Sequence, residues 1–80
     1  MKTRRLTLAL RGEIFSGTAE EVLSAINSTS MMPMDNWQQY AARWNHYAHI
    51  LGQPVLDNSS AEAFINGLIT TGQAEELKND

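Results

Sequence analysis

The segment from Trp37 to His49, which reads WQQYAARWNHYAH, holds four of the six aromatic residues of this 80-residue chain. Its apolar side chains recur at the spacing of an α-helix, in which successive residues are about 100° apart. They form one stripe: Trp37, Tyr40, Ala41, Trp44, Tyr47, Ala48 and Leu51. A short chain has a thin core, which gains most from large aromatic rings, so the pattern predicts a core-facing helix over 36–51. Alternatively, the rest of so small a chain cannot cover the whole stripe, and part of it stays open to a second subunit or a peptide.

The first residues have the pattern of a β-hairpin. Leucines at 6, 8 and 10 alternate with Thr7 and Ala9, which is the period of a half-buried strand. Gly12 permits the positive φ of a tight turn at Arg11-Gly12 or Gly12-Glu13, after which residues 13–16 return as a second strand. We therefore expect an antiparallel hairpin over 5–16, with Gly17 ending its second strand.

Capping signals predict where the helices begin. Three pairs have the spacing of a capping box, in which the two side chains satisfy each other's free backbone N–H groups: Thr18 with Glu21, Asp35 with Gln38, and Ser59 with Glu62. With the apolar periodicity that follows each pair, they predict helices over 19–28, 36–51 and 60–70. Gly52 and Pro54 mark the end of the long helix. Leu56, in the next connection, is expected to enter the core, and the polar residues 73–80 are expected to form a frayed helical turn or a disordered tail.

These elements predict an α+β fold within a single domain over 1–80. The hairpin comes first and three helices follow, with the long aromatic helix packed between the hairpin and the other two helices. A core of this size supports a free energy of unfolding of only a few kcal/mol, and dimerisation is one way to add to it.

Composition limits the function classes. The chain has no cysteine, which excludes disulfides, thiolate metal sites and thiol nucleophiles, and we expect a cytoplasmic protein. The run from Leu6 to Leu10 is too short for a signal peptide, and no stretch approaches the length of a membrane span. A small-molecule substrate is not indicated.

Positive charge is concentrated at the N-terminus, in Lys2, Arg4, Arg5 and Arg11. After Arg11 the chain carries only two basic residues against nine Asp and Glu, and its formal net charge is -3. This imbalance argues against a broad phosphate-binding face. A nucleic-acid-associated regulator that uses the basic hairpin is the alternative function, and a charged edge strand that resists aggregation is the simpler explanation of the same residues.

The two histidines give little support to an enzyme or a metal site. His46 and His49 lie on the helix away from the aromatic stripe, with no carboxylate one turn before or after either of them. A metal site needs a third ligand, and no serine of the chain lies in the G-x-S-x-G context of a nucleophile. We expect no metal, no cofactor and no enzymatic activity.

The function that the sequence supports best is a non-enzymatic interaction or adaptor module, whose partner is a second copy or another protein. The open edges of a hairpin can pair with another strand. The loop 31–34 carries three methionines, which either fill gaps beneath the helices or form an adaptable contact surface; the sequence favours neither. The residues expected to contact the partner are Arg4, Arg5, Thr7, Met31, Met32 and Met34. The competing surface is the outer face of the long helix, at His46, His49 and Ile50.

Overall fold

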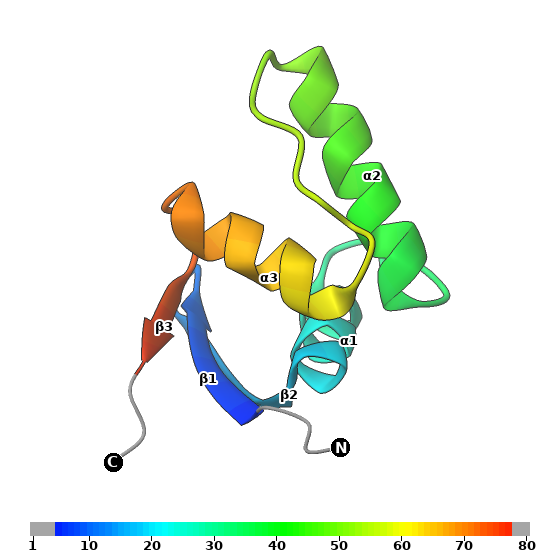
Figure 1. The fold of residues 1–80 in the computed structure, drawn as a ribbon. Coiled ribbons are helices and arrows are strands. Elements are labelled where there is room, and N and C mark those ends of the chain that lie inside the picture. The colour runs from blue at the N-terminus through cyan, green and yellow to red at the C-terminus, as the bar shows by residue number, and fades with distance from the viewer. Residues whose placement is uncertain (1–4, 78–80) are drawn as a thin grey trace.

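The computed structural model describes residues 5–77, and Figure 1 shows its α+β fold. The elements follow in the order β1 (Arg5–Leu10), β2 (Glu13–Thr18), α1 (Ala19–Thr29), α2 (Trp37–Ile50), α3 (Ala61–Thr70) and β3 (Glu75–Leu77). The predicted class is confirmed. The predicted order was incomplete, because a third strand follows the last helix.

The hairpin turns at Arg11-Gly12. Both residues have positive φ, 52° and 81°, as the two central residues of a type I′ turn require. The strands pair from Leu10 with Glu13 to Arg5 with Thr18, so β2 runs two residues beyond the predicted hairpin. Gly17 therefore does not end the strand. It lies inside β2 at φ 141°, where a Cβ atom would come within 2.8 Å of the Glu21 carboxylate.

The prediction of a helical or disordered tail is wrong at residues 75–77. These residues form β3, which pairs antiparallel with β1 from Thr7 opposite Leu77 to Ala9 opposite Glu75. The strand order is β2-β1-β3, so β1 is the central strand and not the charged edge strand expected from its arginines. The unpaired N–H and C=O groups along the second side of β1 explain this pairing, since they favour any segment that can complete them. Residues 78–80 of the tail lie outside the described residues.

The core lies between the sheet and the helices α1 and α3. Leu6 and Leu8 reach it from β1, and the helices α1 and α3 supply most of its other large buried side chains: Val22, Leu23, Ile26, Phe64, Ile65 and Leu68. The apolar periodicity of α1 and α3 predicted these inward faces. Leu56, from the connection between α2 and α3, is also buried, as expected.

The predicted place of the long helix is wrong. α2 packs against α1 and α3 rather than between the hairpin and the other helices, and in Figure 1 its C-terminal half extends away from the sheet. Only Ala41 and Ala48 of its stripe are buried. Three rings of the stripe, Trp37, Tyr40 and Trp44, are partly buried against the core. Phe64 occupies the centre of the core, and Trp44 meets it edge-on with ring centroids 5.7 Å apart.

Only one of the three expected capping boxes forms as predicted. Thr18 and Glu21 make it at the start of α1. The other two helices are capped one residue later than predicted, by Asn36, which accepts from Gln39 N at 2.9 Å, and by Ser60, which accepts from Ala63 N at 3.1 Å. Each true cap follows another residue that can cap, so side-chain chemistry alone does not select between them.

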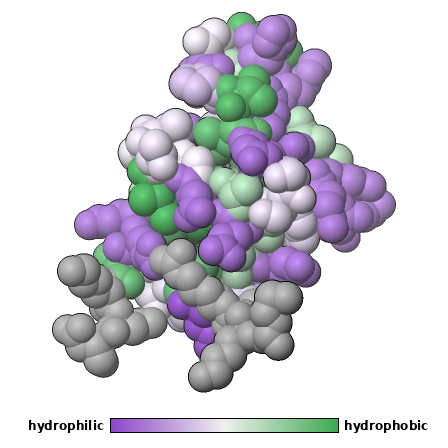
Figure 2. Space-filling model, in the orientation of Figure 1, coloured by the Kyte–Doolittle hydropathy of each residue, from purple (hydrophilic) through white to green (hydrophobic). Residues whose placement is uncertain are grey.

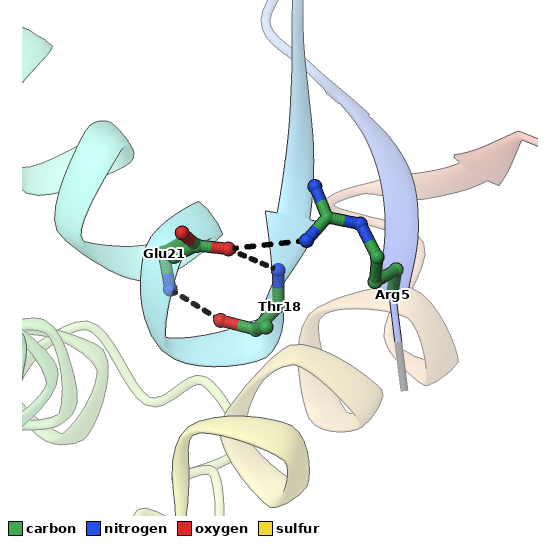
Figure 3. A network of polar contacts seen from close by, with 3 residues as sticks. All are labelled: Arg5, Thr18 and Glu21. Atoms are coloured by element: carbon green, nitrogen blue, oxygen red, sulfur yellow. Dashed lines mark hydrogen bonds and ion pairs between the residues drawn. The ribbon is translucent and has the colours of Figure 1, made fainter. Parts of the chain in front are cut away.

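The Glu21 carboxylate joins the start of α1 to the sheet (Figure 3). Its Oε1 accepts a hydrogen bond from Thr18 N at 2.8 Å and lies 3.8 Å from Nη1 of Arg5. The hydrogen bonds with Thr18, aided by the charge of Arg5, hold the pKa of Glu21 below its ordinary value of 4.5. Since the carboxylate has a lower pKa in the folded state, its stabilisation is present above the unfolded pKa and is lost as pH falls through the folded pKa.

We therefore expect Glu21→Gln to flatten the loss of stability in acid. Glutamine keeps an oxygen that can accept from Thr18 N but does not ionise. The melting temperature of the variant should lie below that of the wild type at pH 7 and converge with it below about pH 4.5. Glu20→Gln removes the same charge from the same helical turn and is the control. If both variants followed the same pH profile, the hydrogen-bonded carboxylate would not be the cause.

Candidate functional site

The Met31 to Met34 loop is fixed to α1 by the buried side chain of Asn27. Its Nδ2 donates to the Met34 carbonyl and its Oδ1 accepts from Met34 N, both at 2.8 Å. This pair of hydrogen bonds holds the end of the loop and leaves Met34 partly buried. Met31 and Met32 extend outward with exposed fractions of 100% and 73%. The loop thus supplies two exposed thioether side chains on an anchored backbone.

The stripe of α2 continues beyond the core at its C-terminal end. Tyr47 and Leu51 are 57% and 70% exposed, although the helical spacing placed them on the core-facing stripe. On the face drawn in Figure 2, hydrophobic residues lie among hydrophilic ones over the upper part of the molecule, where α2 and its following connection lie.

The exposed methionines and the exposed end of the stripe border one open groove of about 670 Å³. Its floor and walls come from α2, the loop after α1, the turn of the hairpin and the segments that follow α2 and α3. The lining residues are Arg11, Thr29, Ser30, Met31, Met32, Tyr40, Arg43, Trp44, Tyr47, Ala48, Leu51, Gln53 and Gln73. The volume is in the range of about 300–1,000 Å³ that is usual for ligand pockets.

Two guanidinium groups lie along this groove. Arg43 donates from Nη1 to the Met32 carbonyl at 2.6 Å, and its guanidinium carbon is 5.8 Å from the centre of the Tyr40 ring. Burial raises the pKa of Tyr40, while the positive charges of Arg11 and Arg43 act in the opposite direction. Both cations are therefore close enough to act on the same phenol, although they come from the hairpin turn and from α2.

The groove is positively charged in a chain of negative net charge. The basic residues in the described part of the chain are Arg5, Arg11 and Arg43, and the last two line the groove, whereas Arg5 pairs with Glu21. None of the described Asp and Glu residues is among the lining residues. The arrangement can hold an anionic group beside apolar side chains.

The structure brings only some of the expected contact residues together. Met31 and Met32 line the groove, and Met34 anchors the loop. Arg5 faces Glu21, and Thr7 lies on the central strand between Ser16 and Leu77, so neither is at the groove. Arg4 lies outside the described residues.

Sequence reasoning did not select Arg11, Arg43, Tyr47 and Leu51 as contact residues. The best signal for Tyr47 and Leu51 was the size of the aromatic stripe, which is larger than a small core can cover. That signal gave Trp37, Tyr40 and Tyr47 as the candidates to stay open, and of these three rings Tyr47 is the exposed one. It could not locate the groove, because the groove is formed by segments that are distant in the sequence.

The histidines are exposed, as expected, and neither lines the groove. Within residues 5–77, no three His, Asp or Glu side chains gather so that they could hold a metal ion. No helix in the same range has both the length and the apolar character needed to cross a membrane.

Comparison with protein-family models, curated proteins and solved structures finds no match to this chain.

Proposed function

We propose that this protein is a non-enzymatic interaction module that docks a segment of another protein in the groove between α2 and the Met31 to Met34 loop. One observation carries the proposal: Met31, Met32, Tyr47 and Leu51 are all more than half exposed and border the same groove. Methionine side chains adapt to varied apolar surfaces, and tyrosine combines a large apolar ring with a polar hydroxyl. The expected cytoplasmic location belongs to the same proposal and rests on the lack of cysteine.

The chemistry of the lining supports binding rather than catalysis. The groove contains the Ser30 hydroxyl, but this group donates to the Asn27 carbonyl at 2.7 Å at the end of α1. No His, Asp or Glu lines the described groove, so no side chain with the usual properties of a general base lies beside that hydroxyl. Aromatic rings, methionines and arginines are the side chains enriched at protein interfaces.

The alternative, a nucleic-acid-associated regulator, has weaker support. It requires the basic hairpin, but Arg5 pairs with Glu21 and Arg11 faces the groove. Two cations beside aromatic rings can also bind a single strand, so an oligonucleotide belongs in the test.

The proposal predicts groove-binding peptides in an unbiased library. The protein is presented to displayed random peptides, and the selected peptides are titrated into isotope-labelled protein while amide chemical shifts are followed. We expect shifts at residues 29–32 and 40–51. Tyr47→Ser combined with Leu51→Ser should weaken binding about tenfold or more, because the few side chains that dominate an interface each cost more than about 1 kcal/mol when truncated.

The control combines Ile50→Ser with Val55→Ser, which removes two similarly exposed apolar side chains that do not line the groove. This variant should bind as the wild type does. Shifts confined to the hairpin, or to His46, His49 and Ile50, would contradict the proposal. Light scattering over a range of concentrations, with the same two variants, determines whether a second copy is the partner.

A further inference from the structure

The charge of the groove is opposite to that of the molecule around it. Arg11 and Arg43 line it and no described carboxylate does, while the whole chain carries a formal net charge of -3. A partner with negative charge at this position is attracted to the groove and repelled by the acidic remainder of the surface. Such complementarity determines specificity and orientation more than affinity.

The two cations differ in how they are held. Arg43 is fixed by its hydrogen bond to the Met32 carbonyl and by its position near the Tyr40 ring. A guanidinium has five N–H donors, so the single bond to Met32 leaves donors for an incoming carboxylate. Arg11 is an exposed residue at the tip of the hairpin and lines the groove from that turn.

Arg11 is also an unfavourable residue for the backbone of the turn. Its φ of 52° makes it the only described non-glycine residue with positive φ, at a turn position where Asn, Asp and Gly are favoured. Its side chain therefore contributes nothing that the turn itself requires. A non-glycine residue held in such a sparsely populated backbone conformation suggests that its side chain has a functional role.

We propose that the groove selects an acidic peptide segment, in which Asp or Glu side chains meet Arg11 and Arg43 and an adjacent bulky apolar side chain packs against Tyr47, Leu51 and the two methionines. This inference rests on the proposed function and specifies its partner. The apolar side chain supplies the buried area, and the carboxylates orient the segment along the groove.

The test uses the peptides selected from the unbiased library. They should be enriched in Asp and Glu next to Leu, Phe, Ile or Met. The tightest peptide is compared with a counterpart in which every Asp is Asn and every Glu is Gln. Binding is read from the fluorescence of the protein's tryptophans, since Trp44 lines the groove. Because the peptide carries more than one carboxylate, the counterpart should bind about tenfold or more weakly at low salt, and the difference should shrink as salt screens the charges.

Arg11→Asn separates a binding role from a structural role. Asn tolerates positive φ better than Arg, so the melting temperature should stay the same or rise, while affinity for the acidic peptide falls about fivefold. Arg5→Gln removes the same charge outside the groove and is the matched control, with affinity close to that of the wild type.

The outcomes distinguish this inference from the proposed function. If the selected peptides bind the groove but are not enriched in Asp and Glu, and if Arg11→Asn binds them with the affinity of the wild type, this inference is overturned. The proposed interaction module would still stand. Failure to select any peptide that shifts the groove amides would overturn both. A labelled single-stranded oligonucleotide that shifts the groove amides, and that binds more tightly than every selected peptide, would assign the cations to nucleic acid instead.

Discussion

Phe64→Ala is expected to lower the free energy of unfolding by about 3–5 kcal/mol, which approaches the whole stability of a domain this small. Phe64 is fully buried in the core, and its ring is perpendicular to that of Trp44, with ring centroids 5.7 Å apart. Truncation removes a large apolar surface from the core and leaves a cavity beside Trp44. Urea denaturation followed by circular dichroism measures the effect.

Phe15→Ala is the control for this prediction. Phe15 lies on β2, opposite Leu8, and is only partly buried, so the same truncation should cost clearly less. Because Phe64→Ala could abolish folding, Phe64→Leu is a milder companion that should give a smaller, measurable loss. A cooperative transition of Phe64→Ala at the wild-type urea midpoint would contradict the position of Phe64 at the centre of the core.

Leu56→Ala is expected to lower the free energy of unfolding by about 2–5 kcal/mol, although Leu56 lies in an irregular connection. Its side chain is buried against α3, where a Cβ atom on Gly67 would come within 3.0 Å of it. Its backbone is held by Asn45, which donates from Nδ2 to the Leu56 carbonyl at 2.8 Å and accepts from Leu56 N at 2.9 Å. Leu56 thus attaches the connection to both α2 and α3.

The exposed neighbour Val55 provides the control. Val55→Ala should change the free energy of unfolding by less than about 0.5 kcal/mol, since the Val55 side chain is more than half exposed and little buried surface is lost. A second measurement uses amide exchange: in Leu56→Ala, protection should fall in α2 before it falls in β1. Equal losses for the two variants would mean that the connection does not couple the helices.

The predictable parts of the fold were those that depend on neighbouring residues. Leu6, Leu8 and Leu10 have the strand period, and Gly12 accepts the positive φ of the turn, so the hairpin was clear from the sequence. The three helices were located to within a residue or two, and the Thr18 capping box was correct. Each of these features is visible as a pattern of side chains within about four residues of one another.

The candidate site was predictable only in its parts. The methionine loop was recognised as a contact candidate, but its anchoring by Asn27 was not, because side-chain hydrogen bonds between residues seven apart leave no periodic pattern. Arg11 was assigned to a basic hairpin, whereas the structure places it beside Tyr40 and Arg43, which are far along the chain. No spacing rule connects these residues.

The sequence by itself determined the α+β class, the turn of the hairpin and the apolar faces of α1 and α3. The tertiary structure decided the position of β3, whose three residues include two glutamates and become a strand only because one side of β1 was available to pair. It also decided how much of the aromatic stripe is covered. Leu56, Phe64 and the other core side chains fill the interior, so Tyr47 and Leu51 have no place in it and remain at the groove. Periodicity shows which residues share a face of a helix, but the volume of the core sets how far along the helix that face is buried.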